Sequence, residues 1–260
     1  MFDCISIIGC GLIGSSIVRA ISEKHISKKI VIYDKSNKAL SFLKKEIPKV
    51  VLAKDLFTAS KNADLLIVAT PLSSYKEIFL TIKDCIKKNA IITDTGSAKK
   101  EINKIIENLD LKNNSWIASH PIAGTEDSGP KAGYAKLFEN RWCIISPSPK
   151  AKKEEIMQVQ KFWELLGSKV KVMSFEEHDY ILSLTSHLPH AIAYSLVRTA
   201  IDSKDKFKKA VIQYSAGGLR DFTRIAASDP VMWRDIFLDN SENILKTLDN
   251  FSNNLEELKK

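Results

Sequence analysis

The stretch CISIIGCGLIG, residues 4–14, decides the fold of the first part of this chain. Its first five residues form an apolar, β-rich run, and three glycines in the pattern GxGxxG follow at once. Between a strand and a helix, such glycines permit a tight turn, let a pyrophosphate approach the backbone and let the helix pack closely. The helix N-terminus adds unpaired N–H groups for phosphate. We therefore expect a dinucleotide to contact Gly9, Gly11, Leu12, Ile13 and Gly14.

An acidic residue follows at the distance that such a site needs. Asp34 ends a second apolar run, Ile30–Tyr33, and stands twenty residues after Gly14. A carboxylate there can accept hydrogen bonds from the adenosine ribose hydroxyls and would repel a 2′-phosphate, so NAD is favoured over NADP. Lys35 and Lys38 weaken that preference. The alternative is a glycine turn beside a chance surface aspartate.

Two hydropathy patterns divide the chain. Residues 1–173 alternate short apolar runs with helix-like segments, which is typical of βαβ units and a mainly parallel sheet. Further strands are expected at residues 65–69, 90–93, 116–118, 142–146 and 170–173. Residues 174–260 read as helix nearly throughout. The predicted fold is α/β, with an N-terminal Rossmann-type doubly wound sheet over residues 1–173 and an all-α C-terminal domain over residues 174–260.

The last predicted helix has an apolar stripe on one face. Its residues are spaced 4, 3, 4 and 3 apart: Ile244, Leu248, Phe251, Leu255 and Leu258. The stripe can pack onto the rest of the helical domain or can form a subunit interface, and the sequence favours neither reading.

Polar segments follow three of the expected strands. Because the carboxyl ends of parallel strands meet at one edge, where ligands bind in open α/β sheets, we expect these segments to share a site. Thr70 and Pro71 would contact the cofactor. Ser97 could contact a ligand or could only cap a helix. His120, in the loop SHPIAGTE, can bind a hydroxyl and take its proton near neutral pH.

The helical half contains the segment His187-Leu188-Pro189-His190, in which Pro189 should kink a helix. Two histidines at this spacing can take part in a metal site. However, hydride transfer to a dinucleotide needs no metal, and no third ligand with firm spacing appears in the sequence. We expect no metal here.

Arginine is rare in this chain and clustered. Only six of the 39 basic residues are arginine, and three of them lie within residues 220–234. Arg220 and Arg224 are four residues apart and share a helix face. The planar guanidinium fork suits a carboxylate ligand. The alternative is surface pairing with Asp221 or Asp235.

Composition excludes several classes of protein. The net charge is +8, but the lysines are spread along the chain, so we expect no nucleic-acid partner. The longest apolar runs are far shorter than the ~20 residues that span a bilayer, so we expect no membrane association. The four cysteines are scattered without a CxxC pair, which favours reduced thiols in a cytoplasmic protein over a zinc site or disulfides.

Five segments, taken in order, resemble the prephenate dehydrogenase family of tyrosine biosynthesis: GCGLIG, DTGSAK, SHPIAGTE, SHLPHA and GGLRDFTRIAASDPVMWRD. The resemblance implies a dinucleotide-binding domain and a helical domain through which two subunits dimerise. It implies NAD-dependent oxidative decarboxylation of prephenate to 4-hydroxyphenylpyruvate. Family members often add a chorismate mutase segment or a regulatory domain, and we expect neither within these 260 residues.

The resemblance also implies residue roles, carried over motif by motif. His120 would bind the 4-hydroxyl of the cyclohexadiene ring and accept its proton, and Ser97 would bind the same hydroxyl or His120. Arg224 would hold the ring carboxylate, and His190 would face the pyruvyl side chain. The remaining expected substrate contacts are Thr125, Glu126, Arg220 and Trp233, with Arg220 serving either its own or the partner's site.

Two other dinucleotide proteins are the main alternatives. A β-hydroxyacid dehydrogenase would use a lysine on the helix after the sheet, but residues 180–197 contain none. A non-catalytic NAD sensor would have no need for His120 together with Arg224. Prephenate and arogenate differ by a keto or an amino group on the side chain. His190 favours the keto acid slightly, because a cationic amine would favour an acidic neighbour.

Overall fold

The glycine-rich stretch folds as its pattern predicts. Strand β1 (Cys4–Ile8) ends at the glycines, and helix α1 (Leu12–Glu23) begins there. Ile7 of the strand and Ile17 and Ile21 of the helix have no exposed surface, so apolar packing holds the two elements together.

The computed structural model describes residues 2–109, 111, 114–125, 127–202, 210 and 213–260.

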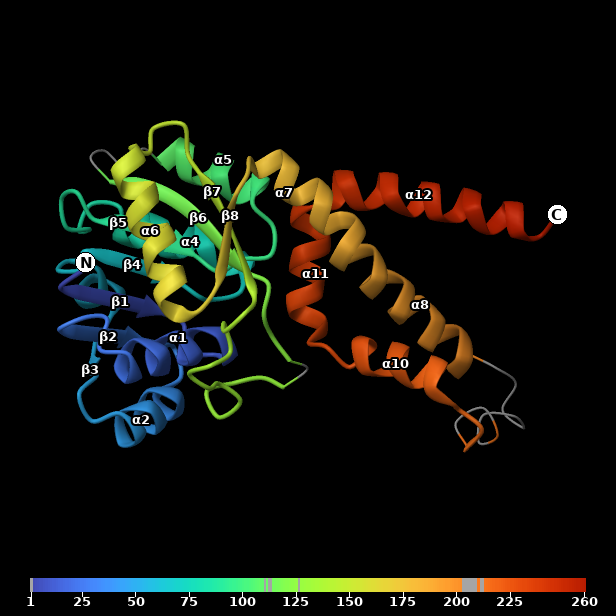
Figure 1. Cartoon of the computed structure of the whole chain (residues 1–260), viewed down its shortest axis with the longest axis horizontal. Coiled ribbons are helices and arrows are strands. Elements are labelled where there is room, and N and C mark those ends of the chain that lie inside the picture. The colour runs from blue at the N-terminus through green and yellow to red at the C-terminus, as the bar shows by residue number, and fades with distance from the viewer. Residues whose placement is uncertain (1, 110, 112–113, 126, 203–209, 211–212) are drawn as a thin grey trace. The chain divides into compact units, whose positions relative to one another are not determined.

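The described residues form one eight-stranded sheet in the order β3-β2-β1-β4-β5-β6-β7-β8 (Figure 1). The strands after β1 are β2 (Lys29–Tyr33), β3 (Val51–Leu52), β4 (Leu65–Val68), β5 (Ile91–Asp94), β6 (Ser115–Pro121), β7 (Trp142–Pro147) and β8 (Lys169–Val172). Every neighbouring pair is parallel except β6 and β7. The strand order reverses between β1 and β4, which confirms the doubly wound, Rossmann-type prediction.

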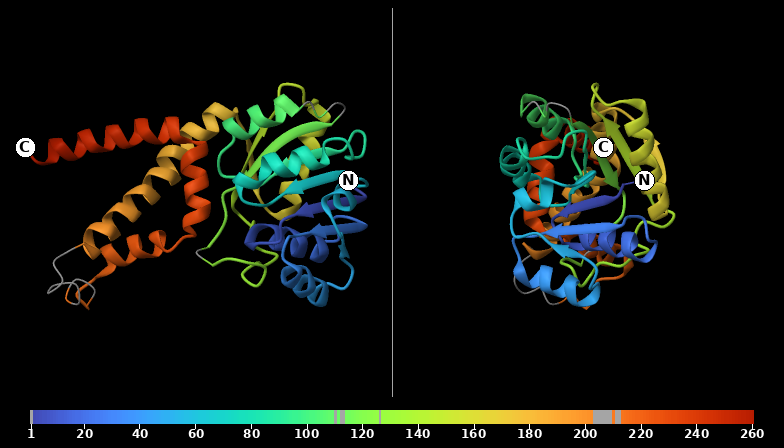
Figure 2. Two further views of the ribbon diagram at one scale, coloured as in Figure 1. Left: turned by 180° about the vertical axis from the view of Figure 1, so that it is seen from behind. Right: turned by 90° about the vertical axis from the view of Figure 1, so that its left-hand side faces the viewer.

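Helices cover both faces of the sheet. Helices α1 and α6 (Lys153–Leu166) pack together on one face, and α3 (Leu56–Ser60), α4 (Tyr75–Ile82) and α5 (Lys100–Leu109) lie on the other (Figure 2). Helix α2 (Asn37–Glu46) joins β2 to β3, and the short 3-10 turn η1 (Leu72–Ser74) precedes α4. Strand β3 was not among the predicted strands, because two exposed residues are too few to show alternation.

The chain divides into two compact units, Met1–His178 and Asp179–Lys260. The described residues of the second unit are helical, as predicted. Its elements are the end of α7 (Phe175–Leu182), the π-helical turn η2 (Ser183–His187), α8 (Leu188–Ile201), α10 (Gly217–Ala226), α11 (Pro230–Asp239) and α12 (Ser241–Leu258). No helix in the described ranges is both long and apolar enough to cross a membrane.

A π-helical turn directly precedes the helix that begins around Pro189, the residue expected to kink a helix. The N–H of Leu188 bonds back five residues to the carbonyl of Ser183, and α8 starts with the proline in its first turn. Proline has no N–H and its ring clashes with the carbonyl four residues earlier, so the regular ladder cannot continue through it. Such turns often mark functional sites.

Candidate active site

The glycine turn after β1 can be built only with glycine at two positions. Gly9 has a φ of +96°, a left-handed conformation that other residues rarely adopt. A Cβ on Gly9 would lie 2.5 Å from the carbonyl oxygen of Ala69, and one on Gly14 would overlap the carbonyl of Gly9. Strand, turn and helix are therefore packed as closely as a dinucleotide fingerprint requires.

Gly11 has the opposite environment. Apart from Gly11 itself and its two chain neighbours, no described residue has an atom within 4 Å of where its Cβ would be, so the turn leaves open space at the helix N-terminus. Helix α1 begins at Leu12 with no side-chain cap. The N–H groups of Leu12, Ile13 and Gly14 belong to the first turn, which has no earlier carbonyl to bond. Open space and free donors together suit a pyrophosphate.

A pocket of about 260 Å³ lies beside this turn. It joins the ends of β1, β2 and β4 to the start of α4. The residues that line it include five of the predicted cofactor contacts: Gly9, Gly11, Asp34, Thr70 and Pro71. The structure thus brings the glycine turn, Asp34 and the Thr70–Pro71 segment to one pocket, whose lining does not include Ser97 or His120.

Asp34 is held at the end of β2 by backbone donors. Its Oδ2 accepts a hydrogen bond from the N–H of Cys10 at 2.6 Å, and its Oδ1 accepts one from the N–H of Ser36 at 2.7 Å. Each carboxylate oxygen keeps a further lone pair for a ribose hydroxyl. Burial raises the pKa of the Cys10 thiol to about 12, so this residue adds no negative charge beside the phosphate position.

Lys35 also lines the pocket and could attract a 2′-phosphate. Its Nζ lies 3.4 Å from Oε2 of Glu77 on α4, and both side chains are exposed. This surface pair offsets part of the positive charge that weakened the sequence argument for NAD.

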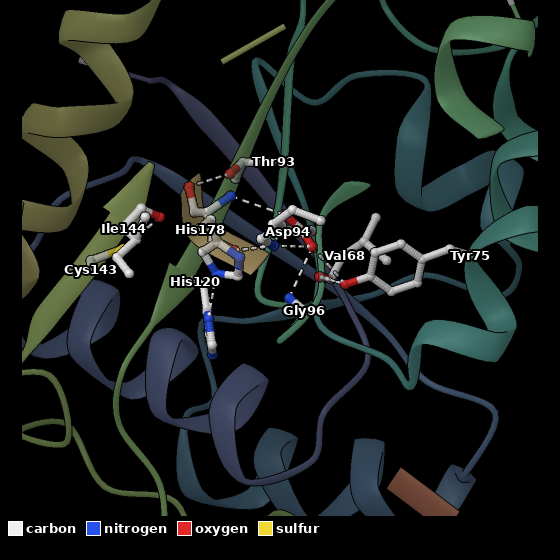
Figure 3. A network of polar contacts seen from close by, with 11 residues as sticks. Val68, Tyr75, Thr93, Asp94, Gly96, His120, Cys143, Ile144 and His178 are labelled. Atoms are coloured by element: carbon white, nitrogen blue, oxygen red, sulfur yellow. Dashed lines mark hydrogen bonds and ion pairs between the residues drawn. The ribbon is translucent and has the colours of Figure 1, made fainter. Parts of the chain in front are cut away.

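A buried ion pair lies at the end of β5. The Nζ of Lys99 is 2.8 Å from Oδ1 and 2.7 Å from Oδ2 of Asp94, and both side chains are completely buried. Asp94 also accepts hydrogen bonds from the hydroxyl of Tyr75 at 3.0 Å and from the N–H of Gly96 at 2.9 Å (Figure 3). Burial and the Asp94 charge raise the pKa of Tyr75 well above its ordinary value, so its hydroxyl stays a donor.

The same ion pair holds strand β6 against β5. Lys99 donates to the carbonyl of Ser119 at 2.7 Å, and Asp94 accepts from the N–H of Ser119 at 3.0 Å. The hydroxyls of Ser119 and Thr93 lie 2.7 Å apart. Ser119 is therefore held at its carbonyl, its N–H and its hydroxyl. These bonds also fix the backbone that leads to His120.

His120 lies within β6 and not in the loop that the sequence predicted. It pairs with Ile144 of β7 in the antiparallel part of the sheet, and 8% of its surface is exposed. The expected strand ended at residue 118, but pairing with β7 extends it to Pro121. Strand β5 pairs only with the first two residues of β6, so parallel pairing alone would have ended it early.

His120 contacts a second buried histidine. Its Nδ1 lies 2.8 Å from Nε2 of His178, which has no exposed surface (Figure 3). His178 lies in the first turn of α7, directly after β8. Ser174 caps this helix, since its hydroxyl accepts from the N–H of Glu177 and its carbonyl accepts from that of His178.

The other predicted residues of the first unit are less enclosed. Ser97 is half-buried in the loop between Asp94 and Lys99, three residues before α5 begins, so it is not the N-cap of that helix. Thr125 is exposed, and its hydroxyl accepts from the N–H of Asp127 at 3.3 Å. Glu126 lies outside the described residues.

In the second unit, His190 and Trp233 form a stack. Their ring centroids lie 3.5 Å apart with planes inclined by 20°, and Trp233 is 6% exposed. The Nδ1 of His190 lies 2.9 Å from the carbonyl of Ser186, so Nδ1 donates and Nε2 is left as an acceptor. Burial lowers the pKa of His190 below its ordinary value and keeps the ring neutral near pH 7.

Arg220 and Arg224 lie on α10, a helix with no buried residue. Both side chains are exposed, and neither has an ion pair within the described ranges of the chain. Of the acids that could have satisfied the cluster, Asp235 pairs with Arg234 at 2.6 Å. The side chains of Arg220 and Arg224 are therefore exposed on α10 in the single chain.

Four polar residues of this site were not among the sequence candidates: Tyr75, Asp94, Lys99 and His178. Asp94 and Lys99 belong to the quoted segment DTGSAK, where a strand-end acid and a lysine five residues later are a usable signal. In a lysine-rich chain, however, no pattern distinguishes a buried lysine from a solvated one. Within the described ranges, no group of three or more His, Cys, Asp or Glu residues could hold a metal.

Two family models together match most of the chain. The model described as prephenate dehydrogenase, nucleotide-binding domain, matches residues 17–172, and that described as prephenate dehydrogenase, dimerization domain, matches residues 174–260. The first match begins after the glycine turn, so the geometry of that turn is an independent observation.

Relatives of known name point the same way. The chain is 37% identical to the cyclohexadienyl dehydrogenase of Zymomonas mobilis, over all of this chain and 88% of the relative. It is 34% identical to the prephenate dehydrogenase of Bacillus subtilis, over all of this chain and 70% of the relative. Among solved structures, the prephenate dehydrogenase of Aquifex aeolicus with hydroxyphenyl propionate and NAD+ is 34% identical, with a TM-score of 0.91 over all of this chain and 90% of that one.

Proposed function

The chain belongs to the prephenate dehydrogenase family, and from this premise we propose how its own residues carry out the NAD-dependent oxidative decarboxylation of prephenate to 4-hydroxyphenylpyruvate. This reaction is a step of tyrosine biosynthesis. The observation that carries the residue assignment is His120, a buried histidine fixed in β6 by the Asp94–Lys99 pair. We also propose the domain division between residues 173 and 174 and a cytoplasmic location, which the four free cysteines support.

The pocket beside the glycine turn suits NAD. The open space at Gly11 and the first-turn N–H groups of Leu12, Ile13 and Gly14 would receive the pyrophosphate. Asp34 would accept the adenosine ribose hydroxyls, and Thr70 and Pro71 would line the neighbouring wall. When bound, NAD takes up the hydride that leaves C4 of the substrate.

Asp34 is tested by cofactor choice. Asp34→Ala should narrow the preference for NAD over NADP, because the carboxylate that repels a 2′-phosphate is gone. Turnover is measured with each cofactor in both proteins, and Glu77→Gln serves as the control for the neighbouring surface charge. Equal turnover with both cofactors in the unmutated protein would contradict the role of Asp34.

His120 would accept the proton of the 4-hydroxyl as that carbon is oxidised. It is a base of suitable strength near neutral pH, and its position is fixed before the substrate binds. Ser97, held in the loop between Asp94 and Lys99, would bind the same hydroxyl or His120. Loss of hydride and CO2 makes the ring aromatic, so the chain needs mainly to orient the ring and remove one proton.

Arg224 would hold the ring carboxylate. That carboxylate leaves as neutral CO2, so an arginine there stabilises the ground state more than the late transition state, and its main effect is orientation and discrimination. Trp233 would form an apolar wall, and His190 would face the side chain of the substrate. We assign further substrate contacts to Thr125, Glu126 and Arg220.

A second substrate, arogenate, is favoured by one observation. Because Nδ1 of His190 donates to Ser186, its Nε2 can only accept a hydrogen bond while the ring is neutral. A keto oxygen has no proton to offer Nε2, but the ammonium group of arogenate has three. This makes arogenate a second substrate beside prephenate, although the sequence suggested a slight preference for the keto acid.

The proposed function is tested by NADH formation from the purified protein. Prephenate and arogenate are each supplied with NAD and with NADP, and the aromatic product is identified. We expect NADH from prephenate with NAD, and slower but measurable NADH from arogenate. No NADH from prephenate would overturn the assignment, and no NADH from arogenate would overturn only the second substrate.

The helical domain forms a homodimer, as its family model describes. In the single chain, the apolar stripe of α12 grows more exposed toward its end, from 5% at Ile244 to 43% at Leu255 and 84% at Leu258. Such a surface needs a partner. Sedimentation should give about twice 29.2 kDa, and a monomer at micromolar concentration would contradict this arrangement.

A further inference from the structure

The contact between His120 and His178 limits what His120 can do. A neutral imidazole has one N–H and one bare nitrogen, so of two facing ring nitrogens one must donate and the other accept. Nδ1 of His120 and Nε2 of His178 lie 2.8 Å apart, which is hydrogen-bond distance. Both rings are buried, so the bond is protected from exchange with water.

The direction of this bond decides whether His120 is a base. If His178 donates, Nδ1 of His120 is the acceptor and Nε2 of His120 carries the proton. That Nε2 then has no free lone pair with which to accept the proton of the substrate. If His120 donates, its Nε2 is bare and can accept the substrate proton. The proposed role of His120 requires the second arrangement.

We propose that His178 is a positioning residue that fixes His120 in the tautomer with Nδ1 protonated and Nε2 bare. This inference rests on the proposed function, in which His120 accepts the hydroxyl proton. His178 accepts at Nε2 and therefore carries its own proton on Nδ1. When Nε2 of His120 takes up the substrate proton, Nδ1–H keeps its bond to His178, so the imidazolium forms without breaking a contact.

The fold places His178 at this position through the sheet. Strand β7 pairs His120 with Ile144 and Ile144 with Lys171 of β8, so the ends of β6 and β8 are in register. The chain then leaves β8 and enters α7, which Ser174 caps. The first turn of α7 carries His178. The partner of the base is thus carried by the segment that leads out of the sheet.

An imidazole at position 178 and a carboxylate at that position would affect the charge of His120 differently. Asp94 and Lys99 bond the backbone of Ser119 next to His120, Tyr75 donates to Asp94, and Cys143 lies against the His120 backbone. The fully buried Asp179 follows His178 in the chain. Asp94 and Lys99 carry opposite charges, and burial raises the pKa values of Tyr75 and Cys143 so that both stay neutral. An imidazole at position 178 orients His120 through the hydrogen bond, whereas a carboxylate there would also stabilise the imidazolium by its charge.

Three substitutions separate orientation from mere packing. His178→Gln keeps an acceptor near the position of Nε2, so kcat should fall less than about tenfold and the pH midpoint should stay in place. His178→Leu removes the acceptor, so kcat should fall about 10²-fold while KM for prephenate changes little. His178→Glu adds a negative charge, so the pH at which activity rises should move up by about one unit. Glu177→Gln, on the exposed side of the same turn, is the control.

A direct measurement uses nitrogen chemical shifts. The chain has five histidines, so the [15N]histidine-labelled enzyme can be assigned by single substitutions. We expect His120 to show a protonated Nδ1 and a bare Nε2 in the unmutated enzyme, and to lose this pattern in His178→Leu. A protonated Nε2 on His120 in the unmutated enzyme overturns the proposal.

The two levels of the hypothesis fail separately. If His120→Asn leaves turnover intact, the base assignment itself is wrong. If His120→Asn lowers turnover while His178→Leu and His178→Gln are equally active, or if His178→Glu leaves the pH profile unmoved, the base assignment stands and the role of His178 is refuted.

Discussion

The two units hold their site residues in opposite ways. In the first, His120 follows a serine bonded to a fully buried ion pair, and its ring contacts a buried histidine. In the second, Arg224 is exposed on a helix that has no buried residue. A proton acceptor must be at a fixed place before reaction, because a misplacement of about 1 Å can cost 10²-fold in rate. A guanidinium that binds a carboxylate can be ordered by the ligand itself.

The largest effect is expected from a substitution of His120, the proposed base of the first unit. His120→Asn keeps a hydrogen-bonding side chain but removes the base, so kcat should fall by about 10²–10⁴ with a smaller effect on substrate binding. Steady-state kinetics with prephenate and the pH profile measure this. The unmutated enzyme should gain activity as pH rises and His120 loses its proton, and the variant should lose that dependence. A variant with normal turnover refutes the assignment.

The next largest effect is expected from a substitution in the buried Asp94–Lys99 pair of the same unit. Lys99→Met leaves the Asp94 carboxylate buried without its cation, so the free energy of unfolding should fall by about 3–5 kcal/mol. Lys104→Met removes a lysine of the exposed pair with Glu101 and should change it by less than about 1 kcal/mol. Urea denaturation of both variants gives the comparison. Equal losses would mean that the buried pair is no more important than a surface pair.

The third effect tests the exposed half. Arg224→Ala should raise KM for prephenate with little change in kcat, at a cost of about 2–5 kcal/mol in binding, since the ring carboxylate loses its partner. Arg224→Lys should recover only part of this, because a point charge cannot reproduce the fork. Arg198→Ala, at another exposed arginine of the same unit, is the control. A lower kcat with unchanged KM would contradict the proposal that Arg224 acts mainly by binding the ring carboxylate.

The smallest effect concerns stability against pH. The lowered pKa of His190 means that the unfolded chain, with its histidine near pKa 6.5, binds a proton before the folded chain does. The free energy of unfolding should therefore decrease as pH falls below about 6.5, and it should be unaffected above it. His190→Gln should flatten this slope. Urea midpoints at pH 7.5 and 5.5 measure it, and equal slopes in both proteins would show that His190 does not contribute.

Much of the first unit was predictable, because its signals are local. The turn GxGxxG and Asp34 need only neighbouring residues to define a strand, a tight bend and a helix, and the structure places them at one pocket with Thr70 and Pro71. The alternation of short apolar runs with helices likewise gave the doubly wound sheet. These features depend on backbone conformation and hydropathy over ten to thirty residues, which a sequence displays directly.

Tertiary structure alone decided the features that join distant residues. The sequence placed His120 in a loop, whereas pairing with β7 keeps it in a strand beside His178. It could not distinguish buried Lys99 from the many solvated lysines, nor stack Trp233 on His190. The charge, tautomer and partner of each group depend on which atoms lie within about 3 Å after folding, and chain segments some twenty to sixty residues apart supply those atoms.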